Sequence, residues 1–441
     1  MPINVAKIYS TLGNNSSLIP LAIKDLSSSA GMTAGSYFTG KEEGRDRFID
    51  EIGTEMIWLF GIPLFKKLYD LTVFKALGLD AKFDARNFKD KGVLEKIKEF
   101  APNEDVKQSI EKATSKEKLF KNTTSVKFFV STGLAIATYV LLTKFKQKFT
   151  EKKIRQNLID EYNKQKELEQ KEKENQNTFE KNQQSPSFKG VGSAIEYFAF
   201  NPVRNMWILD GSITYERLRN SRNPQEFIGY AIKEASLFFF MYYAGGKIQE
   251  LVEKHINEKH NKSIALDARV LEGDALKESF KDGSIQKYLD EFEAIKSAKE
   301  GSKLSKDSVE LYEFLHKNPE NMIVKVAKQS DIISTYKKTG KIDTRKYIEL
   351  KDVEEINNKI KLLYEQYKEA LKNGETSEKF FEGVRKYKRS SIRTNILSSI
   401  FALGVLTPAI MLAKRLAKKD DEEFETKKQI REQLVKEGLI A

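Results

Sequence analysis

The sequence contains no cysteine and only three histidines in 441 residues. Without cysteine, disulfide bonds and thiolate metal sites are excluded. Two of the histidines, His255 and His260, lie five residues apart, which is not the i, i+4 spacing that places two imidazoles on one helix face for zinc. We therefore predict no metal site and no cofactor.

Proline and glycine are also sparse, with nine and 24 residues respectively, which favours helices. The sequence has no phosphate-binding or dinucleotide-binding glycine loop, no G-x-S-x-G, no H-E-x-x-H and no EF-hand loop. The apolar stretch SLIPLAI near the start is too short for a removable signal peptide. Sparse proline and glycine thus predict an all-α protein. Missing motifs do not exclude an enzyme, but none of the residues points to one, and we predict no catalytic residues.

Long apolar runs stand out in a strongly charged chain, whose charged residues make up 32% and whose mean hydropathy is -0.52. Residues 128–142 and 396–413 carry no charge, and each run leads directly into a cluster of Lys and Arg. Such runs are typical of membrane spans, and the basic clusters favour a cytoplasmic position for those ends. We therefore predict a multipass protein of the cytoplasmic membrane.

Two further apolar segments are shorter or interrupted. The segment at 48–65 carries acidic residues at its start and Pro63 near its end, where a kink is expected. The segment at 227–246 contains Lys233 and Glu234. The sequence leaves open whether these two segments span the membrane fully.

The order of several short matches indicates an internal duplication with two apolar helices in each half. The matches are FIDEIGTE (48–55) with FIGYAIKE (227–234), Asp84-Ala85-Arg86 with Asp267-Ala268-Arg269, and Gly133, Leu141 and Lys144 with Gly404, Leu412 and Arg415. Because each half holds two apolar helices, both halves are expected to enter the membrane in the same direction. The two Asp-Ala-Arg triplets are expected to cap helices with a local ion pair.

These features divide the chain into six parts. We predict a loosely ordered segment (1–40), a first repeat (41–150), a charged linker (151–190), the first part of a second repeat (191–269), a soluble helical insertion (270–390), and a final membrane helix with a basic tail (391–441). The insertion contains an amphipathic helix expected to start at Asp352 and to stop at Gly374. As an addition outside the membrane, it is the expected site for a protein partner.

Glu55 and Glu234 occupy equivalent places in the two halves, at the start of the apolar runs. A carboxylate inside a membrane is costly, so two facing glutamates indicate a site for an ion or a proton. The alternative is that both lie at head-group depth or near a helix N-terminus, where a negative charge is tolerated. The charged neighbours Asp50, Glu51 and Lys233 favour this alternative.

Basic residues next to the apolar segments are candidates for contacts with lipid phosphates. They are Arg45, Arg47, Arg217, Arg219, Arg222, Lys144, Lys146 and Arg415. With a net charge of +12, the chain favours an anionic partner, and membrane lipid fits better than nucleic acid because the aromatics concentrate in apolar runs.

Three functions are consistent with these observations. The first is a non-enzymatic membrane scaffold or lipid-interacting protein. The second is a small transporter or channel that uses Glu55 and Glu234. The third is a basic, soluble helical protein that binds nucleic acid. No ligand, biological process or oligomeric state is predicted from the sequence.

Overall fold

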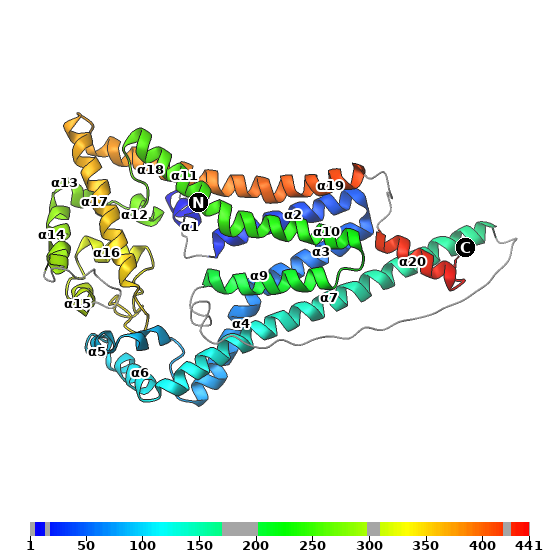
Figure 1. The fold of residues 1–441 in the computed structure, drawn as a ribbon, viewed down its shortest axis with the longest axis horizontal. Coiled ribbons are helices and arrows are strands. Elements are labelled where there is room, and N and C mark those ends of the chain that lie inside the picture. Colours follow the sequence, from blue (N-terminus) through cyan, green and yellow to red (C-terminus); the bar gives the residue numbers. More distant parts are fainter. Residues whose placement is uncertain (1–4, 14–17, 170–201, 298–308, 418–424, 441) are drawn as a thin grey trace. The chain divides into compact units, whose positions relative to one another are not determined.

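The computed structural model describes residues 5–13, 18–169, 202–297, 309–417 and 425–440. Throughout these residues the regular structure is helical and no strand is formed, as Figure 1 shows. The prediction of an all-α protein is confirmed. Residues 170–190 of the predicted linker, residues 191–201 of the predicted second repeat and residues 418–424 of the basic tail lie outside the described residues.

Internal contacts divide the chain into two compact units, and each of them collects segments from distant parts of the sequence. Unit 1 comprises residues 1–21, 67–127 and 245–397, and unit 2 comprises residues 22–66, 128–244 and 398–441. Several long helices pass from one unit into the other, which explains why the units do not follow the predicted domain boundaries.

Unit 1 is a set of short helices around an apolar core. Its helices are α1 (Val5–Leu12), α5 (Lys91–Glu99), α6 (Glu104–Ser115), α11 (Gly245–His260), α12 (Ala268–Glu272), α13 (Ala275–Lys281), α14 (Ser284–Ser297), α15 (Val309–Lys317), α16 (Met322–Gln329), α17 (Leu350–Lys372) and most of α18 (Ser377–Phe401), with a 3₁₀ turn η3 at Ala85–Lys89. Ile97, Ile323 and Leu363 are fully buried. This arrangement of apolar interior and charged surface is that of a protein domain in water.

Three Asp-x-Arg triplets have the same local geometry in unit 1, two at the start of helical turns and one in a turn between helices. The carboxylates of Asp84 and Asp267 each accept the backbone N–H two residues on and pair with the following arginine, at 2.7 and 3.0 Å. This confirms the predicted caps. The triplet Asp343-Thr344-Arg345 has the same geometry, with an ion pair of 2.8 Å, and was not predicted.

The predicted insertion at 270–390 is helical, but it packs with residues 67–127 in the same unit. Lys96 on α5 pairs with Glu313 on α15 at 2.5 Å, and the backbone N–H of Asp84 donates to the carbonyl of Arg345 at 2.8 Å. The compact unit is therefore larger than predicted. Helix α17 begins at Leu350 rather than at Asp352, whereas Gly374 ends it in the left-handed conformation, with φ of 83°.

Unit 2 is a bundle of long helices. It contains most of α2 (Ile19–Thr39), α3 (Lys41–Met56), the start of α4 (Ile62–Tyr69), most of α7 (Glu117–Glu169), α9 (Pro202–Arg219), α10 (Pro224–Phe238), α19 (Thr407–Ala417) and α20 (Glu425–Lys436). Helices α1 and α2 cover much of residues 1–40, so the prediction that this segment is loosely ordered was wrong.

Single π-helical turns interrupt several bundle helices without ending them. The turns are η1 (Ile57–Gly61) between α3 and α4, η4 (Phe239–Ala244) between α10 and α11, and η5 (Ala402–Leu406) between α18 and α19, with a further turn η2 at Asp70–Phe74. Pro63 and Pro408 each follow a π turn by two residues. Because proline has no N–H to give to the preceding turn, the wider turn lets the helix continue past it.

Small residues bring two bundle helices into close backbone contact. Ser27, Gly31 and Gly35 repeat every four residues on α2, and the backbone of Gly31 lies against the carbonyl of Gly404 in η5. A side chain at Gly31 would overlap that carbonyl. Such small-residue stripes are typical of helix pairs that pack in membranes.

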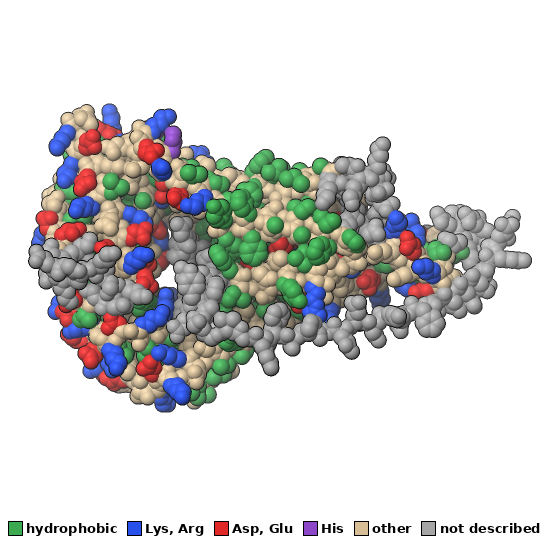
Figure 2. All heavy atoms as spheres, in the orientation of Figure 1, with side chains coloured by type: hydrophobic (Ala, Val, Ile, Leu, Met, Phe, Trp, Pro, Cys, Tyr) green, Lys and Arg blue, Asp and Glu red, His purple; other side chains and the backbone are tan. Residues whose placement is uncertain are grey.

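The outer surface of the bundle is apolar. Along α3, η1 and α4, exposed side chains recur every four residues at Phe48, Ile52, Met56, Phe60 and Leu64. Exposed apolar residues also lie on α7, η4 and α19, and in Figure 2 green side chains gather over the bundle while blue and red ones crowd unit 1. The bundle therefore has the reverse of the usual polarity of a helix in water.

Two helical segments among the described residues are long and apolar enough to cross a membrane. They are Glu117–Asn163 and Ser377–Ala413, which contain the two charge-free runs predicted as spans. By length and composition these helices are compatible with spans.

Candidate functional site

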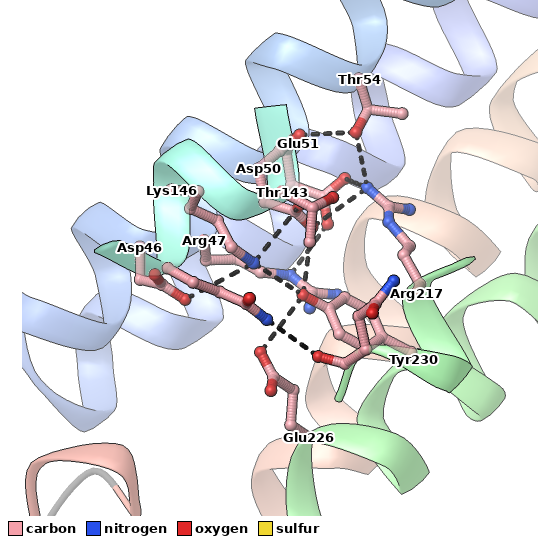
Figure 3. A network of polar contacts seen from close by, with 12 residues as sticks. Asp46, Arg47, Asp50, Glu51, Thr54, Thr143, Lys146, Arg217, Glu226 and Tyr230 are labelled. Carbon is pink, nitrogen blue, oxygen red and sulfur yellow. Dashed lines mark hydrogen bonds and ion pairs between the residues drawn. The ribbon is translucent and has the colours of Figure 1, made fainter. Parts of the chain in front are cut away.

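Ionisable side chains line the inner face of α3. Asp46, Asp50 and Thr54 form one row at intervals of four residues, and Arg47, Glu51 and Glu55 form a second row beside it. All three carboxylates from Asp50 to Glu55 are at most 4% exposed. We call this set and its partners on the neighbouring helices the ionic ladder, and Figure 3 shows its central part.

The first step of the ladder is centred on Asp46. Arg222, in the turn between α9 and α10, pairs with Asp46 Oδ2 at 2.6 Å, and Thr150 on α7 donates to Oδ1 at 2.6 Å. Lys146, one turn earlier on α7, lies 3.8 Å from the same carboxylate. Arg222 also pairs with Glu226 at 2.8 Å, so this step joins α3 and α7 to the start of α10.

The second step is centred on Asp50. Lys146 Nζ lies 3.5 Å from its Oδ1, and Arg217 Nη2 lies 3.2 Å from its Oδ2. The hydroxyl of Tyr230 joins these groups, since it accepts from Lys146 at 3.0 Å and donates to Asp50 at 3.3 Å. A path of ion pairs and hydrogen bonds through Lys146 therefore links the first step to the second.

The third step joins the two halves of the predicted duplication. Lys233 on α10 pairs with Glu51 on α3 at 2.6 Å and lies 3.5 Å from Glu234. Arg217 pairs with Glu234, lies 3.5 Å from Glu51, and donates to Thr54 at 2.9 Å. Arg217 thus contacts three carboxylates at once, and it is 2% exposed.

The ladder ends at Glu55. The hydroxyl of Ser29 on α2 lies 2.7 Å from Glu55 Oε1 and 3.1 Å from Glu51 Oε2. Glu55 Oε2 is buried and has no hydrogen-bond partner among the described residues. Two more buried carboxylates, Asp25 on α2 and Asp210 on α9, belong to the same bundle, and Asp210 accepts a hydrogen bond from Tyr242.

Local sequence signals fix the residue at which α10 begins. Asn223 caps α10 by accepting the N–H of Glu226 at 2.8 Å, and Pro224 occupies the first turn. The helix therefore starts at a defined residue, and Glu226, Tyr230 and Lys233 fall on one face.

The structure places both predicted glutamates inside the bundle. Glu55 and Glu234 are 4% and 3% exposed, and they are connected through Ser29, Glu51 and Lys233 rather than directly. Their environments differ, because Glu234 is paired with Arg217 and Lys233 while one oxygen of Glu55 is unpartnered.

The residues predicted to contact lipid phosphates fall into two groups. Arg47, Arg217, Arg222 and Lys146 lie inside the bundle, and their charges are matched by its carboxylates. Arg219 and Lys144 are exposed. Arg45 is partly buried, and two of its guanidinium nitrogens have no hydrogen-bond partner within the described part of the chain. The side chain of Arg415 lies outside that part.

Asp46, Thr150, Tyr230 and Ser29 were not predicted as site residues. The spacing of Asp46, Asp50 and Thr54 along one helix face was the available signal, but it resembles an ordinary solvated face. Their partners come from segments about 100 to 180 residues away, as for Thr150 with Asp46 and Tyr230 with Asp50.

Comparison of the chain with protein-family models, curated proteins and solved structures finds no match.

Proposed function

We propose that this chain is a multipass integral membrane protein that passes a small cation through the polar interior of its helical bundle. The observation that carries the proposal is the reversed polarity of unit 2, with an ionic ladder inside and apolar side chains outside. Charged residues of membrane bundles face the interior and mark the paths of ions or protons.

The dimensions of the bundle support a membrane location. The exposed apolar row from Phe48 to Leu64 covers 16 helical steps, about 24 Å at 1.5 Å per residue. The exposed row on α7 from Phe129 to Phe145 has the same length. Both lengths approach the hydrocarbon core of a bilayer, about 30 Å thick. An apolar surface this large is not expected on a soluble nucleic-acid-binding protein.

Glu55 lies on the inner face of the helix, level with the middle of that exposed row, and this position favours transport over a purely structural role. Glu55 precedes Met56, the midpoint of the row between Phe48 and Leu64. A carboxylate near the midplane is costly and is retained where it serves an ion path. In this proposal Glu55 lies deep in the membrane rather than at head-group depth.

We further propose that the bundle arose by duplication, with α2 and α3 equivalent to α9 and α10. In each pair a helix is followed by a short turn, a second helix with inward-facing charges and a π turn, and then by an Asp-Ala-Arg cap in unit 1. The same order in both halves supports a parallel repeat. Arg219 and Lys144, which are exposed, stay candidates for lipid phosphate contacts at a cytoplasmic membrane.

Membrane residence is tested by extraction. The protein is expected to stay with membranes after carbonate or high-salt washing and to be released by detergent. Release by carbonate alone would contradict the proposal.

Cation passage is tested in liposomes that contain the purified protein, with fluorescent indicators for protons, Na⁺ and K⁺. Tyr230→Phe removes only the hydroxyl between Lys146 and Asp50, and it is expected to slow the flux. Tyr215→Phe, at an exposed position of α9, is the matched control and should leave the flux unchanged. If liposomes with wild-type protein pass none of these cations faster than empty liposomes, the proposed function is wrong.

A further inference from the structure

The hydroxyl of Ser29 lies within hydrogen-bonding distance of two carboxylates, Glu51 and Glu55, at 3.1 and 2.7 Å. A hydroxyl carries one proton, so it can donate to only one of them. The other close contact needs a proton on the carboxyl side, because two oxygen lone pairs at hydrogen-bonding distance repel each other. Protonation of one of the two glutamates satisfies both contacts at once.

The surroundings identify which glutamate carries that proton. Glu51 accepts a 2.6 Å ion pair from Lys233 and a 2.8 Å ion pair from Arg47, and Arg217 lies 3.5 Å away. These cations stabilise Glu51 as a carboxylate. Glu55 has an unpartnered, buried Oε2, and its Oε1 is the atom close to Ser29. A buried carboxyl without a charge partner is more stable when neutral.

We propose that the cation passed by the bundle is the proton, and that Glu55 delivers it through the hydroxyl of Ser29 to Glu51. This inference rests on the proposed function and names the transported species and the step. In the starting arrangement the Glu55 carboxyl donates to Ser29 Oγ, and the Ser29 hydroxyl donates to Glu51 Oε2.

The transfer is balanced at every atom. The Glu55 O–H bond breaks as a new O–H bond forms on Ser29 Oγ, and the original Ser29 proton moves to Glu51. Glu55 becomes a carboxylate, Glu51 becomes neutral, and serine is regenerated. Arg217 stays protonated and carries no proton itself; it contacts both Glu51 and Asp50 and so holds the end of this step beside the carboxylate that Tyr230 contacts.

The roles of the two glutamates named from the sequence therefore differ. Glu55 is the group that carries the exchangeable proton. Glu234 is fixed by Arg217 and Lys233 and holds these cations in position. Glu234 acts as a positioning residue.

The test uses liposomes that contain the full-length protein, a potassium gradient with valinomycin to set the voltage, and an internal pH dye. Glu55→Gln and Ser29→Ala are each expected to lower the proton flux by about a hundredfold, the lower range for loss of a positioned proton-transfer group. Ser29→Thr keeps the hydroxyl and should retain flux. Glu250→Gln and Ser115→Ala, at exposed positions, are the matched controls and should leave it unchanged.

A second measurement detects the proton without transport. Infrared spectra of the wild-type protein should show the C=O stretch of protonated carboxyl groups. The difference spectrum between the wild type and Glu55→Gln should contain such a band, and the difference between the wild type and Glu250→Gln should not. Absence of the band from the first difference spectrum would overturn the assignment to Glu55. Unchanged proton flux in Glu55→Gln would overturn the relay.

The failure of this inference is distinct from the failure of the proposed function. If the wild-type protein passes Na⁺ or K⁺ but not protons, the proton relay is wrong while passage through the bundle stands. If it passes no cation, both are wrong.

Discussion

The two units of the molecule both have buried apolar side chains, but they differ in the charged side chains that they bury. In unit 1, fully buried positions are held by Ile323, Leu363 and similar apolar residues, and charged side chains lie mostly at the surface. In unit 2, Lys146, Arg217 and Lys233 are buried with their carboxylate partners, and large apolar residues are exposed. Buried ion pairs combined with exposed large apolar residues therefore distinguish unit 2 from unit 1.

The proposed membrane location of unit 2 accounts for this contrast. In water, burial of apolar surface drives folding at about 25 cal/mol per Å². For a bundle surrounded by lipid, apolar side chains gain little by moving inward, so close packing and polar contacts hold the helices together. The Gly31–Gly404 contact and the ionic ladder are interactions of this second kind.

The largest expected effect in this comparison is the loss of a buried charge from the ladder. Arg217→Met leaves Asp50 and Glu234 without their shared partner, and breaking such a buried pair costs about 3–5 kcal/mol. Thermal unfolding in detergent should report this loss. Arg219→Met, at an exposed position on the same helix, should change stability by less than about 0.5 kcal/mol. Equal stability of the two variants would show that the ladder does not hold the bundle.

In unit 1 the strongest effect is expected from the apolar core. Leu363→Ala on α17 removes a fully buried side chain and should cost about 2–5 kcal/mol. Its neighbour Leu362 is 40% exposed, so Leu362→Ala serves as the control and should cost much less. Hydrogen exchange of α17 in the full-length protein measures both. Similar losses of stability in the two variants would contradict the assignment of Leu363 to an apolar core.

Unit 1 should also lose stability in acid through His316. Burial lowers the pKa of His316 from 6.5 to about 4, and its ring stacks on Phe100 and Tyr312. Because the unfolded chain binds the proton more readily, stability from this group is complete above pH 6.5 and is lost as the pH falls toward 4. The shift of roughly 2.5 pH units corresponds to about 3 kcal/mol.

The measurement is hydrogen exchange of α15 between pH 7 and 4 in the wild type and in His316→Phe, after correction for intrinsic exchange rates. The variant keeps the aromatic stacking and lacks the titrating group, so it should lose less stability over this range. The same pH dependence in both proteins would assign the effect to other groups.

The smallest expected effect concerns the close contact between bundle helices. An added methyl group in Gly31→Ala would overlap the carbonyl of Gly404, and overpacking of this kind costs about 1–3 kcal/mol. Gly133→Ala on α7 meets open space and should instead stabilise its helix by about 0.5–1 kcal/mol. Thermal unfolding in detergent separates the two. A stabilising Gly31→Ala would show that the helices can separate at little cost.

Local signals in the sequence determined the secondary structure and part of the capping. Sparse proline and glycine predicted helices, and the triplets at Asp84 and Asp267 predicted helix caps with ion pairs, which the structure confirms. These features depend on residues only a few positions apart, so the chain specifies them before any tertiary contact forms. The charge-free runs at 128–142 and 396–413 likewise lie in long continuous helices for a local reason.

The ionic ladder was decided only by the tertiary structure. Neither the sign nor the spacing of the charges on α3 distinguishes an inner face from a solvated one, and the sequence favoured an interfacial place for Glu55 and Glu234. The pairing of Glu51 with Lys233 and of Asp50 with Arg217 joins residues more than 160 positions apart. Only the packing of α2, α3, α7, α9 and α10 brings these groups together, because an ion pair between helices depends on their register and orientation, which helical periodicity does not encode.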